Sequence, residues 1–248
     1  MPSIQKDIKT LVLEAGRKDY RLDFRLHMPA ALSYPLQSSF YNWNYYSEPE
    51  PFMKGRKIYQ PRGKVLGGSS SINGMIWIRG NPLDFDKWAS NQGLENWSYK
   101  DCLPYFKSIE TSLYRESSLR GQEGELRVQK AACKNPLFEA FFASVKEAGY
   151  NLNDDINARE QEGFSAFDQT IFKGRRLSAA RAFLHKALHR KNLELTTGAL
   201  VHKILFEKNK AVGVEYSLGR KIIKAYCKEV ILAAGAINSP QILQLSGI

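Results

Sequence analysis

The chain has 248 residues, 43% of them hydrophobic and 25% charged, which is an ordinary composition for a globular protein. It contains no apolar run of about 18 residues, the length that spans a membrane, and no secretory signal is visible at its N-terminus. Three widely separated cysteines exclude a complete disulfide framework and favour a reducing compartment, while the net charge of +11 leaves a nucleic-acid-binding module open.

The first predicted element is a short buried strand over Lys9–Gly16, an apolar run that ends in the acid Glu14 and a glycine. Such a strand needs a partner, so we expect a further segment upstream of it. Residues 20–59 are rich in aromatic residues and prolines without a clean period, which predicts long loops with short helices. A helix is predicted to start in Pro82–Gln92, and Ser98 is expected to cap the next one.

The middle of the chain alternates between polar and helical sequence. Residues 112–125 are polar and predict an exposed connection, and residues 151–170 predict an irregular segment. Between them, Asn135 and Pro136 are typical of a helix start, and Gly149 of a helix end. The apolar side chains of this helix recur at helical spacing and are expected to be buried: Leu137, Phe138, Phe141, Phe142, Val145 and Ala148.

The last third changes from helical to extended sequence. Ser178 is expected to cap a helix that runs to Arg190, and a helix is predicted from Asn238 onward. Between them Val230–Gly235 is apolar throughout, as in a central parallel strand that is covered on both faces. Four alternating segments predict antiparallel strands: Leu193–Thr196, Leu200–Phe206, Ala211–Tyr216 and Lys221–Ala225. The element order predicts an α/β plus α+β fold whose two ends look severed.

Three features predict one nucleotide site. Glu14 ends a strand, where dinucleotide-binding folds place an acid that binds ribose hydroxyls. In Pro61–Gly80, two adjacent glycines and three serines put bare backbone and hydroxyls against an anionic or planar ligand. A flexible linker is the alternative, but a linker does not run directly into the apolar segment Ile72–Ile78. Val230–Gly235, followed by small residues and a helix, would let a ligand approach the backbone closely.

Two of these stretches carry a family resemblance. Pro61–Gly80 and Gly235–Ile248 resemble the two signatures of the glucose–methanol–choline oxidoreductases, and both are long and specific. The resemblance covers nearly the whole chain, and Gly16–Phe24 and Met28–Leu32 are most similar to the choline-oxidising members. Further matching segments are Tyr41–Tyr45, Ser47–Pro51, Gly80–Trp88, Gln161–Phe164 and Gly174–Ala182.

The resemblance implies an incomplete Rossmann-like FAD-binding domain with an antiparallel meander and part of a substrate-binding domain. It divides the chain into 1–110 and 174–248 for the FAD-binding domain and 111–173 for the substrate-binding domain. FAD would be held non-covalently, because Ile72 stands where some relatives attach it through a histidine. The implied contacts are Glu14 to the ribose, Val65, Gly67, Gly68 and Ser69 to the pyrophosphate and flavin, Asn73, Gly74 and Met75 to the ring, and Val201 to the adenine.

Two parts of the family pattern do not occur in the chain. No G-x-G-x-x-G is present, and by resemblance it would precede Lys9. The catalytic base would lie beyond Ile248, since no histidine of the chain (His27, His185, His189 and His202) matches it. His185 and His189 are spaced like metal ligands, but they lack a nearby carboxylate or cysteine and are interpreted as a solvated helix face. No G-x-S-x-G supports serine hydrolysis.

For the intact enzyme the resemblance implies FAD-dependent oxidation of a small primary alcohol, choline to betaine aldehyde, with this chain alone inactive. The alternatives are a related dehydrogenase of aliphatic alcohols and, remotely, the nucleic-acid-binding module. No nucleic-acid partner is expected in the leading interpretation. The sequence leaves the electron acceptor open, with a quinone or the respiratory chain as candidates. The expected location is the cytoplasm or the periphery of a bacterial inner membrane, or mitochondria in a eukaryote.

Overall fold

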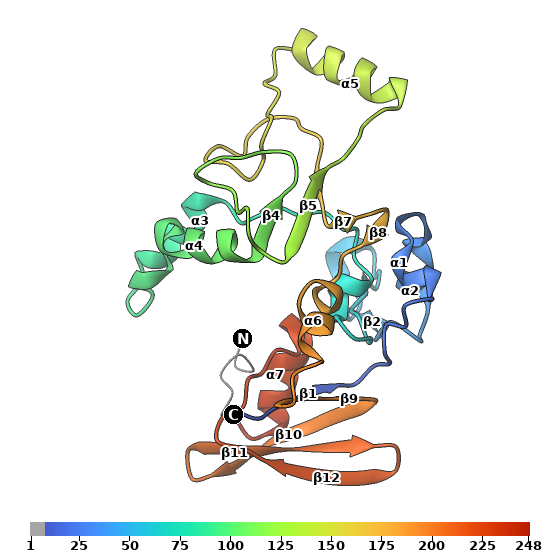
Figure 1. Ribbon diagram of the computed structural model, residues 1–248, viewed down its shortest axis with the longest axis vertical. Coiled ribbons are helices and arrows are strands. Elements are labelled where there is room, and N and C mark those ends of the chain that lie inside the picture. Colours follow the sequence, from blue (N-terminus) through green and yellow to red (C-terminus); the bar gives the residue numbers. More distant parts are fainter. Residues whose placement is uncertain (1–7) are drawn as a thin grey trace. The chain divides into compact units, whose positions relative to one another are not determined.

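The computed structural model describes residues 8–248, which form two compact units (Figure 1). Unit 1 contains the described residues up to Leu26 together with Ala30–Ile72 and Leu184–Ile248. Unit 2 contains His27–Pro29 and Asn73–Phe183. The family's division at residues 110 and 173 stays a prediction. In the described part of the chain, no helix has the length and apolar character needed to cross a membrane.

Unit 1 contains a pair of parallel strands. β1 (Thr10–Glu14) pairs with β9 (Leu193–Thr197), with Thr10 opposite Leu193 and Glu14 opposite Thr197. The strand predicted over Lys9–Gly16 is therefore confirmed, but the antiparallel assignment of the later strand is wrong. Alternation along a strand indicates its two faces and not the direction of its neighbour. Among the described strands, only β9 pairs with β1, so none of them covers the other edge of β1, which we call its open edge.

A three-stranded antiparallel meander follows β9, as predicted. Its strands are β10 (Ala199–Glu207), β11 (Lys210–Leu218) and β12 (Lys221–Tyr226). The β10–β11 turn contains Lys208 at φ 55°, and the β11–β12 turn contains Gly219 at φ 60°. Helix α7 (Gly235–Leu245) lies against β10, where the backbone N–H of Ile204 donates to Ser246 Oγ at 2.8 Å.

The predicted strand Val230–Gly235 is wrong. Residues 230–234 form no strand, Gly235 already begins α7, and Ile231 is 63% exposed. A parallel strand exists only through hydrogen bonds to a neighbour. None of the described strands pairs with this segment, so its apolar sequence alone does not make it extended.

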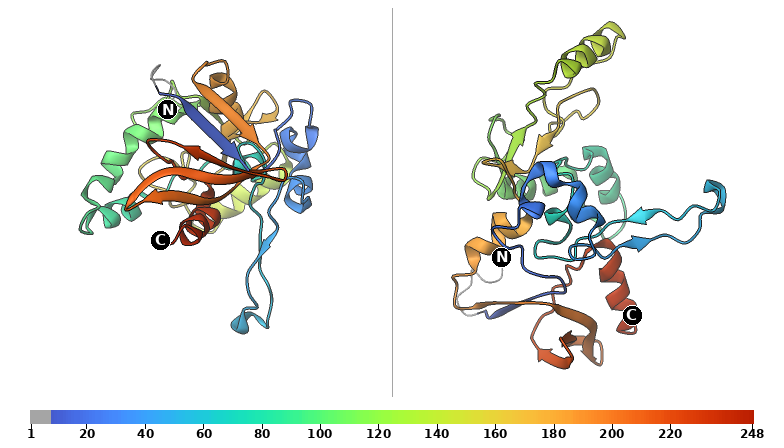
Figure 2. Two further views of the ribbon diagram at one scale, coloured as in Figure 1. Left: turned by 90° about the horizontal axis from the view of Figure 1, so that it is seen from below. Right: turned by 90° about the vertical axis from the view of Figure 1, so that its right-hand side faces the viewer.

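The rest of unit 1 surrounds a small apolar cluster. Leu26, Tyr41, Val65 and Ile72 are each at most 1% exposed and pack together. The predicted loops with short helices are present as α1 (Phe24–His27) and α2 (Ser33–Gln37). The sequence did not predict the hairpin of β2 (Tyr45–Tyr46) and β3 (Tyr59–Gln60), which projects from its unit in Figure 2.

Unit 2 combines capped helices with short strands. Helix α3 (Pro82–Ala89) follows Asn81, whose side chain accepts from the Leu83 amide at 2.9 Å. Helix α4 (Tyr99–Ile109) is capped by Ser98, as predicted. The strands are β4 (Glu110–Ser112), β5 (Leu126–Lys130), β6 (Asp168–Gln169), β7 (Ile171–Phe172) and β8 (Arg175–Arg176).

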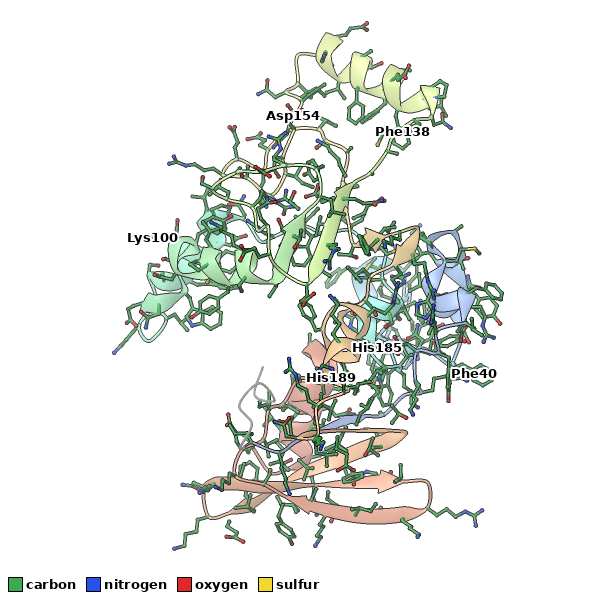
Figure 3. All side chains as sticks on the ribbon, viewed as in Figure 1. Phe40, Lys100, Phe138, Asp154, His185 and His189 are labelled. Carbon is green, nitrogen blue, oxygen red and sulfur yellow. The ribbon has the colours of Figure 1, made fainter. Side chains whose placement is uncertain are left out.

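Helix α5 (Pro136–Glu147) forms where predicted and is capped by Asn135, but its apolar stripe is not buried. Val145 is the one buried residue of α5, while Leu137 is 76% exposed and Phe141 about half exposed. Figure 3 labels Phe138 on the first turn of this helix. Helical periodicity identifies an apolar face, but it does not say which element covers that face.

The connection predicted to be exposed, residues 112–125, contains a wholly buried arginine. Arg120 donates to Glu110 at 2.6 Å, to Asp155 at 2.7 Å and to Asp168 at 2.8 Å. Arg79 joins the same cluster through Glu110 at 3.1 Å. We call these five residues the ionic cluster. Several polar residues of the connection are exposed as predicted, Glu116, Gln122 and Glu123 among them, but Arg120 is polar for another reason, because it neutralises buried carboxylates.

The helix predicted from Ser178 to Arg190 is present in a shorter and less regular form. A π-helical turn covers Ala180–Leu184, and α6 covers His185–Ala187. Ser178 Oγ accepts from the Arg181 amide at 3.3 Å, as its predicted capping role requires.

Candidate functional site

The candidate site of unit 1 lies at the carboxyl ends of β1 and β9. Parallel strands bind their ligands at this edge. Glu14 is the last residue of β1, and the Gly198 amide after β9 donates to the carbonyl of Gly16 at 2.9 Å. Val201 follows on β10 and is half-buried. The structure thus brings Glu14 and the turn before Val201 to one edge.

Glu14 has an unusual protonation equilibrium for a carboxyl group. Partial burial raises its pKa to about 7, although the Gly16 amide, which donates to Glu14 Oε1 at 2.7 Å, acts in the opposite direction. Among the described residues, no cation forms an ion pair with it. Glu14 can therefore act as an acceptor for two neighbouring hydroxyl groups, and it does so best when it is ionised.

A second backbone segment passes very close to Gly16. The Leu66 amide donates to the Arg17 carbonyl at 2.9 Å, and Arg17 and Val65 form a parallel bridge. A Cβ on Gly16 would lie 2.0 Å from the Lys64 carbonyl oxygen, so only glycine permits this approach. Contact with Gly16 therefore places Val65 beside the end of β1, where it is fully buried.

The predicted ligand loop is a tight turn, Gly67–Ser71, which we call the glycine–serine turn. Gly67 has φ 90° and Gly68 φ 56°, conformations that glycine adopts without strain. A Cβ on Gly68 would meet nothing within 4 Å, so bare backbone faces open space there. Such a surface fits a close-lying planar or phosphate-bearing ligand.

The serine hydroxyls of this turn form hydrogen bonds within the segment. Ser70 Oγ donates to the Gly67 carbonyl at 2.6 Å, and Ser71 Oγ to the Leu66 carbonyl at 2.7 Å. Ser69 Oγ accepts from the Gly63 amide at 3.1 Å. These hydrogen bonds, together with that from the Gly68 amide to the Val65 carbonyl at 2.7 Å, hold the turn in shape.

The remaining predicted residues, Asn73, Gly74 and Met75, form a loop of unit 2. Asn73 and Gly74 are exposed and Met75 is 4% exposed. A Cβ on Gly74 would again meet nothing within 4 Å. The loop shows the same bare backbone as the glycine–serine turn, from which only Ile72 separates it in sequence.

Sequence reasoning missed an open depression in unit 1 of about 450 Å³. It adjoins the predicted residues without including any of them. Arg17 lies 5.6 Å from the ring centroid of Tyr20 and 5.9 Å from that of Phe40, so the depression combines cationic and aromatic groups. Its lining residues are Ala15, Gly16, Arg17, Tyr20, Ser39, Phe40, Lys64 and Gly198. The signal in the sequence was the run of basic and aromatic residues after Glu14.

His185 and His189 lie at the end of the irregular helix, in unit 1. Figure 3 labels His185 on α6 and His189 on the turn that follows. His185 Nε2 lies 2.8 Å from the buried Asp19 Oδ1, so a carboxylate is nearby after all. Within the described residues, however, no group of three or more potential metal ligands occurs.

Comparison with known proteins gives this geometry a family. The model of the GMC oxidoreductase family matches residues 16–248. The chain belongs to the GMC oxidoreductases. The oxygen-dependent choline dehydrogenase of Staphylococcus xylosus is 54% identical over 240 residues, which are 96% of this chain and 43% of that protein. The enzyme of the same name from Staphylococcus aureus strain MSSA476 is 49% identical over 248 residues and 44% of its length. The chain thus spans less than half the length of these relatives.

Solved structures agree with the assignment. A pyridoxine 4-oxidase from Mesorbium loti has a TM-score of 0.94 and 31% identity, over 100% of this chain and 48% of that one. An FAD-dependent oxidoreductase from Chaetomium thermophilum has a TM-score of 0.89 and 30% identity, over 100% and 44%. The α/β plus α+β fold and FAD as the family cofactor are thereby confirmed. The carboxylate acceptor and the bare backbone of the glycine–serine turn fit that cofactor.

Proposed function

We propose that this chain supplies most of the FAD-binding part of an enzyme that oxidises choline to betaine aldehyde. The observation that carries the proposal is the shared position of Glu14 and the Val65-bearing segment at the carboxyl ends of two parallel strands. Glu14 accepts the adenosine ribose hydroxyls there. The backbone of Gly67 and Gly68 faces the pyrophosphate and flavin, and Val201 contacts the adenine.

Ile72 supports non-covalent attachment of the cofactor. Its side chain is 1% exposed and packs with Leu26, Tyr41 and Val65, so it is part of the core and carries no group that forms a bond to flavin. FAD, when bound, supplies the acceptor for the hydride of the alcohol carbon. The chain's own residues bind and orient FAD. The base that removes the hydroxyl proton belongs to the part of the enzyme that this chain does not cover.

The test is a substrate panel on the complete enzyme that contains this chain, with dye reduction as the readout. We expect kcat/KM for choline to exceed that for aliphatic alcohols of similar size. Equal or higher values for the aliphatic alcohols would instead support the alternative dehydrogenase. The relatives are named oxygen-dependent, so oxygen is a candidate electron acceptor beside a quinone. Oxygen uptake by the purified enzyme during choline turnover would support oxygen.

A second measurement concerns this chain alone. We expect weak FAD binding and no choline-dependent dye reduction, since none of its histidines matches the family's base. Robust turnover by the isolated chain would contradict our assignment of the base to another part of the enzyme.

A further inference from the structure

The loop Asn73–Gly74–Met75 needs support from outside itself. Met75 has φ 61°, a left-handed conformation that costs a non-glycine residue about 1–2 kcal/mol. Its amide donates to Asn73 Oδ1 at 3.0 Å, which closes a local turn. A single local hydrogen bond at best balances that cost, so contacts from neighbouring structure are needed to hold the loop in this shape.

That support comes from a hairpin of β7 and β8. Lys173 and Gly174 form its turn, with φ 50° and 71°. Thr170, just before β7, donates its amide to the Met75 carbonyl at 2.7 Å. The Leu177 amide donates to the Thr170 carbonyl at 2.8 Å, so both strands of the hairpin are fixed at the point where it meets the loop.

Arg176, the last residue of β8, makes the other connection. Its Nη1 donates to the Asn73 carbonyl at 2.5 Å and to Asn73 Oδ1 at 2.9 Å. Asn73 Oδ1 thus accepts from both Arg176 and Met75. Arg176 is 1% exposed, and burial lowers its pKa to about 10, so it stays charged at neutral pH.

We infer that Arg176 is a positioning residue, which fixes Asn73 and thereby the conformation in which the Asn73–Met75 backbone meets the flavin ring. This inference rests on the proposed function. Arg176 acts through Asn73 and needs no contact of its own with the cofactor. A lysine would keep the charge, but its flexible stem holds the donor nitrogen less rigidly between the two Asn73 oxygens than the planar guanidinium does.

The first arm of the test needs no flavin. In hydrogen exchange of this chain, Arg176→Gln is expected to speed exchange of the Met75 and Thr170 amides about tenfold, because charged hydrogen bonds hold the loop. Arg175→Gln, on the same strand, is the matched control and should leave both amides at the wild-type rate. Equal rates in the two variants would overturn the inference. If Arg176→Gln does not fold, Arg176→Lys decides, with an expected intermediate rate.

The second arm uses the complete FAD-loaded enzyme. Arg176→Gln should alter the visible circular dichroism of the bound flavin and lower kcat, whereas Arg175→Gln should do neither. Arg176→Lys should restore part of the signal. Faster loop exchange with an unchanged flavin spectrum would reduce Arg176 to a stabilising role and overturn the inference. If wild-type enzyme bound no FAD, the proposed function would fail, while the exchange arm would still report on the loop.

Discussion

Each of the two units contains an apolar cluster, but unit 2 also encloses the ionic cluster. In unit 1, Val65 and Ile72 are held by an apolar cluster directly before and after the glycine–serine turn. In unit 2, Arg120 lies among Glu110, Asp155 and Asp168, all of them at most 5% exposed. An apolar cluster loses stability in proportion to what is removed, whereas a buried ionic cluster fails when one partner is lost. Residues that are equally buried can therefore differ greatly in how much stability their mutation costs.

The largest expected effect is therefore in the ionic cluster. Arg120→Leu leaves three buried carboxylates without their shared cation, and we expect it to lower the free energy of unfolding by about 3–5 kcal/mol. Urea unfolding followed by circular dichroism measures this. Arg115→Leu is the control, because Arg115 lies 3.9 Å from Asp155 with a side chain 38% exposed, and its loss should cost less than about 1 kcal/mol. Similar losses in the two variants would remove the distinction between the units.

The apolar cluster should respond more moderately. Ile72→Ala removes a side chain that is 1% exposed and is expected to cost about 2–4 kcal/mol in the same unfolding assay. Ile222→Ala, at a position 60% exposed on β12, should change stability by less than about 0.5 kcal/mol. A loss at Ile72 larger than that at Arg120 would reverse the comparison.

Glu14 differs from the acids of the ionic cluster. It is a partly buried acid of unit 1 that forms no ion pair with the described residues. Its pKa of about 7 exceeds the ordinary value of 4.5, so the folded state binds more protons than the unfolded state between these pH values. Stability is therefore expected to fall by about 1–2 kcal/mol as the pH rises through this window, after allowance for solvent screening.

The measurement for Glu14 is the difference in unfolding free energy between pH 4.5 and pH 7.5, compared with Glu14→Gln. The glutamine variant should lose this part of the pH dependence. FAD affinity of the complete enzyme should change in the opposite direction and strengthen above pH 7, because the ionised carboxylate is the better ribose acceptor. A variant with the full wild-type pH dependence would contradict both statements.

The smallest expected effect is at the glycine–serine turn. Gly68→Ala meets open space, so its cost is the left-handed backbone alone, about 1 kcal/mol. The free energy of FAD binding to the complete enzyme should weaken by more than the free energy of unfolding falls. The reason is that the new methyl group fills the surface that faces the cofactor. Gly55→Ala, also left-handed and open, is the matched control and should cost similar stability without affecting FAD. Equal FAD affinity in both variants would contradict this role of Gly68.

The sequence predicted those parts of the fold that depend on local chemistry. The caps at Ser98 and Asn135, the turns of the meander and the strand ending at Glu14 all follow from residues close to one another in the chain. It failed where a distant partner decides the outcome. Val230–Gly235 needs a neighbour to be a strand, α5 needs a cover to be buried, and Arg120 is buried by carboxylates distant in sequence.

The candidate site shows the same division. Glu14 and the glycine–serine turn were found from their own residue types. The close approach of Gly16 to Lys64, and the hydrogen bonds from Arg176 to Asn73, depend on pairs that no local pattern reveals. The segment Gly174–Ala182 was noticed as a family match, but its physical role emerges only from the position of Arg176.

The open edge of β1 has a practical consequence. A strand edge without a partner offers backbone donors and acceptors to any extended chain, and Leu11, within β1, is 39% exposed. We therefore expect two copies of the isolated chain to pair through this edge. The isolated chain should lose solubility with rising concentration, and a charged residue at position 11 is the first substitution for keeping it in solution.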